Sequence, residues 1–188
     1  MHAPLLDALR ALPARSVVGL SGIGGAGKST LAADVEGRLP GLAVVPADGF
    51  LVRDRCLAIT DDWSGLDRER LGGQLLAPFR AEGAATWDEY DWASDSYAPR
   101  SLPPCRILLV EGVGLLHPSL HWDLAVWLDA DPDEALSRAM ARDVRQGVDL
   151  AGWAIWSETD RRYVARFRPE RTADLVIDAA SVGRRARA

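Results

Sequence analysis

A run of nine residues near the start of the chain combines glycines, a lysine and two hydroxyl side chains at a spacing that can hold phosphate. It reads Gly22-Ile23-Gly24-Gly25-Ala26-Gly27-Lys28-Ser29-Thr30 and fits the P-loop pattern GxxxxGK[ST]. Glycines let backbone N–H groups turn inward around phosphate oxygens. Lys28 is expected to reach the β- and γ-phosphates of ATP, and the Ser29 hydroxyl to bind Mg²⁺. The predicted nucleotide-binding residues are Gly22, Gly24, Gly25, Ala26, Gly27, Lys28, Ser29 and Thr30.

Lys28 is the only lysine in the chain. Of the 22 lysines and arginines, all the others are arginines. Because arginine carries the same charge, it can replace most surface lysines. An ammonium group kept at position 28 therefore indicates that a compact point charge is needed there.

Carboxylates follow three apolar segments of the chain. Asp48 lies just past residues 42–45, and Glu111 directly follows residues 107–110. Ligand-binding groups of an open parallel sheet gather at the carboxyl ends of its strands. Phosphoryl transfer to a hydroxyl needs a carboxylate to orient and deprotonate that hydroxyl, so Asp48 and Glu111 are candidates. Asp129, after a third segment, can instead begin the next helix, and Asp48 can instead close an Asx-type turn.

The apolar segments themselves predict the scaffold. Five of them lack alternation and are separated by helical patterns, which favours buried parallel strands at 16–20, 42–45, 107–110, 124–128 and 173–177. Helices are predicted at 5–12, 28–38, 68–79, 132–146 and about 150–166. Asp131 and Pro132 form a good helix start, whereas Gly72 and Gly73 weaken the third helix. The order of elements predicts one α/β domain over residues 1–188, a P-loop NTPase three-layer sandwich with a five-stranded parallel sheet.

Composition excludes several functions. The net charge of -5 and the isoelectric point near 5.2 argue against binding to nucleic acid. No apolar run is long enough for a membrane helix, and Asp7 and Arg10 interrupt the start in a way that argues against a signal peptide. The two separated cysteines suit a reducing compartment. We therefore expect a cytoplasmic protein that binds a small-molecule substrate, with no membrane or nucleic-acid partner, and that can form a homo-oligomer.

A P-loop occurs in several classes of protein, and two of them fit poorly. Guanine-specific GTPases need a further lysine in N/T-K-x-D, which this chain lacks. Residues 71–74 are similar to part of the ABC ATPase signature, but they follow the P-loop too closely. In addition, the strand at 107–110 ends in Glu111-Gly112 rather than Asp-Glu.

The remaining motifs resemble the uridine kinase group, which is related to phosphoribulokinase and bacterial pantothenate kinase. They are the P-loop, Asp48-Gly49-Phe50, Tyr90-Asp91-Trp92, Glu111-Gly112-Val113, Arg142-Asp143 and Ala173-Asp174-Leu175-Val176-Ile177. The resemblance covers nearly the whole chain. It implies a sheet with strand order 2-3-1-4-5, a helical lid at about 138–168, Asp48 as general base, and Glu111 as a residue that helps to bind Mg²⁺.

The resemblance also implies where a substrate binds. Residues 51–104 contain many aromatic residues, show no strong strand, and are predicted to form a substrate-binding insertion. Tyr90 matches a position near the substrate base, and Trp92 of the same motif is also assigned to the substrate. Asp61 is the nearest match to the ribose-binding aspartate, and Asp95 stands where the group has a histidine. The Asp48-Gly49-Phe50 segment is more similar to pantothenate kinase and fructokinase-like relatives than to the Asp-Ser-Phe-Tyr segment of uridine kinases.

Arginines of the predicted helix 132–146 complete the candidate site. Arg138, Arg142 and Arg145 share one helix face and can neutralise charge on the transferred phosphoryl group, or else face solvent. Arg142 is the predicted catalytic arginine, and Arg138 is assigned to the nucleotide. The sequence thus predicts an ATP- and Mg²⁺-dependent kinase whose acceptor is a nucleoside such as uridine or cytidine. The alternatives are a sugar or pantothenate-like alcohol as acceptor, or a nucleotide-binding switch with slow hydrolysis.

Overall fold

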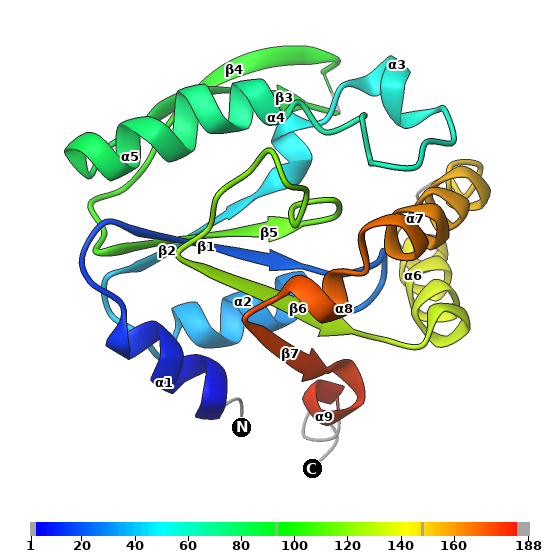
Figure 1. Cartoon of the computed structure of the whole chain (residues 1–188). Coiled ribbons are helices and arrows are strands. Elements are labelled where there is room, and N and C mark those ends of the chain that lie inside the picture. Colours follow the sequence, from blue (N-terminus) through cyan, green and yellow to red (C-terminus); the bar gives the residue numbers. More distant parts are fainter. Residues whose placement is uncertain (1–2, 93, 148, 184–188) are drawn as a thin grey trace.

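A parallel five-stranded sheet forms the centre of the protein (Figure 1). The computed structural model describes residues 3–92, 94–147 and 149–183. The strands of the sheet are β1 (Ser16–Ser21), β2 (Leu42–Pro46), β5 (Ile107–Gly112), β6 (Leu124–Asp129) and β7 (Leu175–Asp178). Each neighbouring pair is parallel, so all carboxyl ends lie at one edge.

Both faces of the inner strands β1 and β5 are covered, which explains why these strands show no polar alternation, whereas the edge strand β7 is partly exposed. All six residues of β1 and of β5 are buried. Val18 and Leu109 pack into one hydrophobic cluster, whereas Val17 and Leu108 pack into a second cluster on the other face. Alternate residues of one strand thus fill two cores, and the predicted three-layer α/β sandwich is confirmed.

Helices form the two outer layers. Helices α1 (Ala3–Ala11) and α2 (Lys28–Glu36) cover one face, and α5 (Ala77–Glu82) lies over the other (Figure 1). The longest helices, α6 (Pro132–Gln146) and α7 (Trp153–Phe167), stand beyond the carboxyl ends of the strands. The short elements are η1 (Ala47–Phe50), α3 (Arg53–Cys56), α4 (Arg68–Arg70), η2 (Leu71–Leu76), α8 (Pro169–Thr172) and α9 (Ala179–Gly183).

The strand order is β2-β5-β1-β6-β7 in chain numbering. The expected order, 2-3-1-4-5, counts only the strands of the main sheet. The labels differ because β3 and β4 belong to a separate hairpin. When the five strands of the main sheet are numbered in chain order, their observed order is also 2-3-1-4-5.

That hairpin corrects the interpretation of residues 51–104. Strands β3 (Thr86–Asp91) and β4 (Ser96–Ser101) pair antiparallel, so the expectation of no strong strand in this segment is wrong. Trp87 and Tyr90 are the buried residues of β3, and Trp87 stacks on Phe50 at 6.3 Å between ring centroids. Their three-residue separation breaks the alternation by which a half-buried strand is recognised.

The predicted helix at 68–79 forms, but not as a regular α-helix. Its middle, η2, is a π-helical turn that contains Gly72 and Gly73, flanked by α4 and α5. Two adjacent glycines weaken the α-helix, and a wider turn is accommodated there. The helix predicted at 132–146 has the predicted bounds in α6. The ends of α1, α2 and α7 differ from the predicted ones by at most three residues, and the last strand lies at Leu175–Asp178 instead of 173–177.

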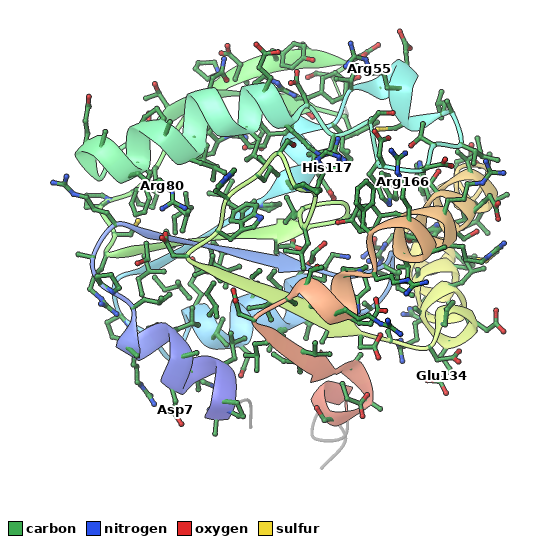
Figure 2. All side chains as sticks on the ribbon, in the orientation of Figure 1. Asp7, Arg55, Arg80, His117, Glu134 and Arg166 are labelled. Atoms are coloured by element: carbon green, nitrogen blue, oxygen red, sulfur yellow. The ribbon has the colours of Figure 1, made fainter. Side chains whose placement is uncertain are left out.

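Local signals that are complete in the sequence act as predicted. Asp131 caps α6, because its side chain accepts hydrogen bonds from the backbone of Asp133 and Glu134. Charged side chains such as Asp7 and Glu134 project from the outer surface (Figure 2). Over the described ranges, every helix is too short or too polar to cross a membrane.

Candidate active site

The P-loop runs from β1 to α2 and is packed closely against α6. Gly25 and Gly27 have positive φ angles of 79° and 101°, which favour glycine. A Cβ atom on Gly25 would also lie 2.1 Å from the backbone oxygen of Ala135 in α6. The glycines are therefore required both by the turn of the loop and by the helix that approaches it.

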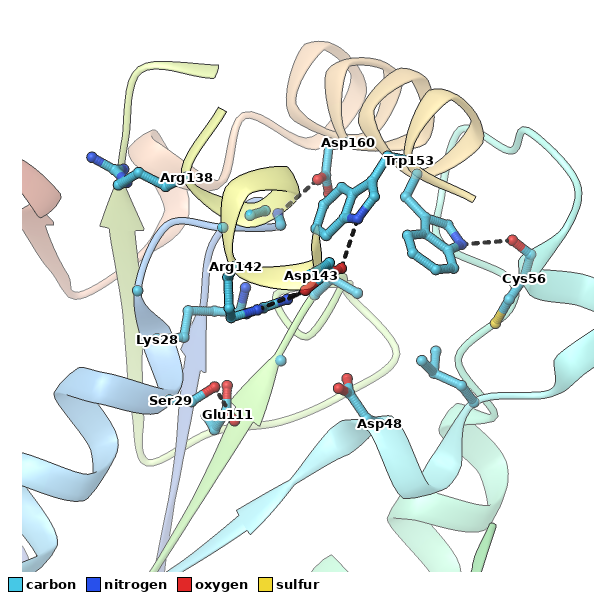
Figure 3. Close-up of a pocket in the computed structure, with 18 of the residues that line it drawn as sticks. Lys28, Ser29, Asp48, Cys56, Glu111, Arg138, Arg142, Asp143, Trp153 and Asp160 are labelled. Carbon is cyan, nitrogen blue, oxygen red and sulfur yellow. Dashed lines mark hydrogen bonds and ion pairs between the residues drawn. The ribbon is translucent and has the colours of Figure 1, made fainter. Parts of the chain in front are cut away.

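A cavity of about 610 Å³ opens beside this loop (Figure 3). Its walls come from the P-loop, the turn η1, the carboxyl end of β5, residues 51–92, α6 and α7. Six of the predicted nucleotide-binding residues line it, namely Gly24, Gly25, Gly27, Lys28, Ser29 and Thr30, whereas Gly22 and Ala26 do not. The predicted Asp48, Glu111, Arg138, Arg142 and Trp92 line the same cavity.

Lys28 is buried, with 8% of its surface exposed, and its ammonium group is held by the loop itself. Nζ donates hydrogen bonds to the carbonyl oxygens of Gly22 and Ile23 at 3.0 and 2.9 Å. Burial lowers the pKa of Lys28, and the carboxylates of Glu111, Asp160 and Asp48 act in the opposite direction. The arrangement places one compact cation among three carboxylates.

Ser29 and Glu111 meet at the base of the cavity. The Ser29 hydroxyl donates to Oε1 of Glu111 at 2.9 Å (Figure 3). Glu111 is 7% exposed, and burial raises the pKa of its carboxyl group, while Lys28 and Ser29 act in the opposite direction. A hydroxyl and a carboxylate beside a phosphate-binding loop are the oxygen ligands that Mg²⁺ prefers. The residues present therefore fit a magnesium ion, which Ser29 and Glu111 would hold.

Weakening either ligand should raise the Mg²⁺ requirement. In Ser29→Ala or Glu111→Gln, we expect the Mg²⁺ concentration for half-maximal activity to rise at least about tenfold, because even outer-shell partners of metals commonly contribute that much. Glu82→Gln, at an exposed position in α5, is the control. A Mg²⁺ titration checks this prediction, and phosphotransfer that survives EDTA would contradict it.

Asp48 lies in η1, the turn that follows β2. Its side chain faces the cavity (Figure 3). The surrounding walls raise the pKa of the Asp48 carboxyl group by desolvation, and the charges of Lys28 and Arg142 act in the opposite direction. Within the described ranges, this carboxylate accepts no hydrogen bond from the backbone of its own turn. Its geometry therefore differs from that of an Asx-type turn.

The backbone of this turn is held from the hairpin. The indole Nε1 of Trp92 donates to the carbonyl oxygen of Asp48 at 3.3 Å. The guanidinium of Arg70 donates to the carbonyl oxygen of Gly49 at 3.2 Å and lies 5.2 Å from the ring centroid of Phe50. Arg70 of α4 and Trp92, which itself lines the cavity, thus fix the position of Asp48.

Two arginines of α6 reach the cavity, and the third predicted one does not. Arg138 and Arg142 line it, and Arg145 lies outside. Nε and Nη2 of Arg142 each bind Oδ1 of Asp143 at 2.8 Å. The indole of Trp153 in α7 donates to Oδ2 of Asp143, also at 2.8 Å. Asp143 is buried, so it anchors the catalytic candidate Arg142 to the next helix.

Comparison with solved structures places this fold among known kinases. A protein from Bacillus stearothermophilus described as a possible uridine kinase matches with a TM-score of 0.72 and 22% identity, over 94% of this chain and 96% of its own. A protein from Silicibacter described as a fructose transport system kinase matches with a TM-score of 0.74 and 25% identity, over 93% and 98%. No protein-family model matches the sequence. The chain has the fold of a uridine kinase-like P-loop kinase.

In this P-loop kinase fold, the residues predicted to bind the substrate are not all at the cavity. Trp92 lines it. The Tyr90 hydroxyl instead donates a hydrogen bond to the carboxylate of Asp95. Asp95 also forms an ion pair with Arg53 at 3.3 Å. Asp61 is exposed and pairs with Arg162 of α7 at 3.7 Å. The structure therefore leaves Tyr90, Asp95 and Asp61 outside the cavity wall.

Other cavity residues of this P-loop kinase fold were missed by the sequence analysis. Trp63, Asp143 and Asp160 line the cavity and are buried. Asp160 is hydrogen-bonded to the P-loop residue Gly24, 136 positions away in the sequence. No local spacing links such residues. The Arg142-Asp143 pair was a usable signal, although only its arginine was assigned a role.

Proposed function

We propose that this protein is an ATP-dependent kinase that transfers the γ-phosphoryl group to a hydroxyl of a small molecule. The observation that carries the proposal is the position of Asp48, whose carboxylate faces the same cavity as Lys28, Ser29, Glu111 and Arg142. A carboxylate at this place, next to a P-loop, can deprotonate an acceptor rather than only bind nucleotide. The structural neighbours support an ATP-dependent kinase.

The charged and hydroxyl side chains named here each have a proposed task in this reaction. Lys28 neutralises the β- and γ-phosphates, and Arg142, oriented by Asp143, compensates the charge that spreads over the transferred group. Asp48 orients the acceptor hydroxyl and takes its proton. Mg²⁺, held by Ser29 and Glu111, would neutralise charge on the phosphate oxygens.

The acceptor occupies the side of the cavity that residues 51–92 form. We call this side the insertion wall, and it consists of Leu51, Cys56, Trp63 and Trp92. Flat indole faces suit a neutral ring with an apolar face, and a nucleoside such as uridine or cytidine is the first acceptor to test. A sugar is the second candidate, because the Silicibacter protein described as a fructose transport system kinase is 25% identical to this chain.

The experiment measures ADP release with separate acceptors, namely nucleosides, sugars and pantothenate. We expect one acceptor class to stimulate release strongly, and mass spectrometry to find the phosphorylated acceptor. Slow ADP release that no acceptor stimulates would contradict the kinase proposal and favour a nucleotide-binding switch. The partners proposed are accordingly small molecules.

A further inference from the structure

One buried carboxylate in the cavity joins three separate parts of the protein. Asp160 belongs to α7 and is 7% exposed. Its Oδ2 accepts a hydrogen bond from the backbone N–H of Gly24 at 2.8 Å, and its Oδ1 accepts one from the indole N–H of Trp63 at 2.9 Å. Each oxygen thus serves a different element, the P-loop on one side and the insertion wall on the other.

On the P-loop side, α7 and Gly24 are in close contact. A Cβ atom on Gly24 would lie 2.9 Å from Cζ3 of Trp153 and 3.4 Å from Oδ2 of Asp160. Within the loop, Lys28 Nζ holds the carbonyl oxygens of Gly22 and Ile23, and the second half of the loop continues into α2. From outside the loop, Asp160 of α7 accepts a hydrogen bond from the backbone N–H of Gly24.

On the other side, Trp63 is a rigid part of the insertion wall. Its φ angle of 55° is left-handed, which a tryptophan adopts only when its surroundings hold it there. Its backbone oxygen accepts hydrogen bonds from Leu66 N at 2.9 Å and Arg68 Nη2 at 3.1 Å. Its Cβ packs so closely on Gly114 that a Cβ there would lie 2.5 Å away. A displacement of Asp160 would therefore either move the insertion wall or break the hydrogen bond between Trp63 and Asp160.

We propose that Asp160 is a positioning residue that keeps the P-loop and the insertion wall at a fixed distance from each other, so that the γ-phosphate and the acceptor hydroxyl meet. The proposal rests on the proposed kinase function. Among the described residues, α7 is also joined to residues 51–104 by hydrogen bonds from Trp156 Nε1 to the Cys56 oxygen and from Thr60 N to Thr159 Oγ1, and by the ion pair between Arg162 and Asp61. None of these three contacts reaches the P-loop.

A carboxylate suits this place because both neighbours are donors. An asparagine has only one oxygen that can accept from Gly24 or Trp63. Its amide N–H₂ group would lie against the other donor, so that one hydrogen bond would be lost in a buried site. Burial raises the pKa of Asp160 to about 6, while the Gly24 N–H, the Lys28 ammonium and the Trp63 N–H act in the opposite direction. The titratable groups that face it are Lys28 and, on its own helix, Tyr163.

The test compares Asp160→Asn, Trp63→Phe and the double variant. Glu158→Gln, an exchange at the same helix two residues earlier, is the control, because Glu158 pairs with Arg161 and Arg162 outside the cavity. In Asp160→Asn, we expect ATP affinity and kcat/KM for the acceptor each to fall about tenfold or more. Trp63→Phe should lower kcat/KM for the acceptor and leave ATP affinity within about twofold. The double variant should be no worse than Asp160→Asn, because both changes remove one shared bond.

A second readout is independent of turnover. We expect ATP to change the tryptophan fluorescence of the wild type, Trp63→Phe to remove the part of this change that comes from Trp63, and Asp160→Asn to lack the same part. The advantage in ATP affinity of the wild type over Asp160→Asn should shrink as the pH falls from 7 to 5, because a protonated carboxyl group is a weaker acceptor. The ratio of the two affinities cancels the titration of ATP itself.

Several outcomes would overturn the proposal. They are additive losses in the double variant, a constant ratio of ATP affinities across this pH range, and an Asp160→Asn protein with a lowered melting temperature but normal ATP affinity and kcat/KM. If Asp160→Asn does not fold, Trp63→Phe decides alone, and an unchanged kcat/KM for the acceptor would contradict the proposal. If no acceptor is phosphorylated, the kinase function fails, whereas the fluorescence and ATP-affinity measurements still test Asp160.

Discussion

Asp48→Asn is expected to lose at least about a hundredfold in turnover while it stays folded and binds ATP about as well as the wild type. Positioned general bases contribute roughly 10²- to 10⁴-fold, and asparagine keeps the size of the side chain but cannot take the hydroxyl proton. The raised pKa of Asp48 adds a pH dependence. Wild-type activity should fall as the pH drops through this pKa, because the base must be ionised, and the variant should lack this limb of the profile.

The measurements are a melting curve, an ATP titration and the rate of acceptor phosphorylation across pH. Asp54→Asn is a matched control, because Asp54 is exposed in the nearby helix α3 and does not line the cavity. A variant at position 48 with normal stability, normal ATP binding and turnover within a few-fold of the wild type would exclude Asp48 as the base.

Lys28→Ala is the second change with a large expected effect. It removes a cation that contacts phosphate in the ground state and in the transition state, so ATP affinity and turnover should both fall, turnover by at least about a hundredfold. Lys28→Arg should also lose ATP affinity and turnover. The ammonium group is enclosed by the carbonyl oxygens of Gly22 and Ile23 at 3.0 and 2.9 Å, a space that a longer planar guanidinium does not fit.

ATP titration and steady-state kinetics check both variants at position 28. Arg38→Lys is the control for the exchange of one cation for another, because Arg38 forms an exposed pair with Asp34. Near-wild-type turnover in Lys28→Arg would show that charge alone is needed, and would remove the significance of the single lysine.

The parts of the fold that were predicted correctly depend on signals that are complete within a few residues. The P-loop needs only its own glycines and the strand and helix beside it. Asp131 caps α6 through the backbone of its next residues. The inner strands β1 and β5 are continuous apolar runs because both of their faces are buried, so a sequence pattern identifies them without knowledge of their partners.

The parts that were missed depend on contacts between distant residues. Trp87 is buried because Phe50 lies against it, which the sequence of the hairpin does not indicate. Asp160 looks like any polar residue of an amphipathic helix, and only the folded chain brings it to Gly24 and Trp63. For Asp61, the resemblance supplied a substrate-binding role, whereas the structure pairs its side chain with Arg162 away from the cavity.

The single lysine gives the protein one cleavage site for a lysine-specific endoprotease, the peptide bond between Lys28 and Ser29. That bond lies where the P-loop enters α2, beside a buried side chain. A protease needs an extended, accessible segment, so it can cut there only after the first turn of α2 has opened. When opening and closing are fast relative to cleavage, the rate of cleavage measures the population of that open form. The residue that defines the nucleotide site is therefore also a built-in probe of its local unfolding.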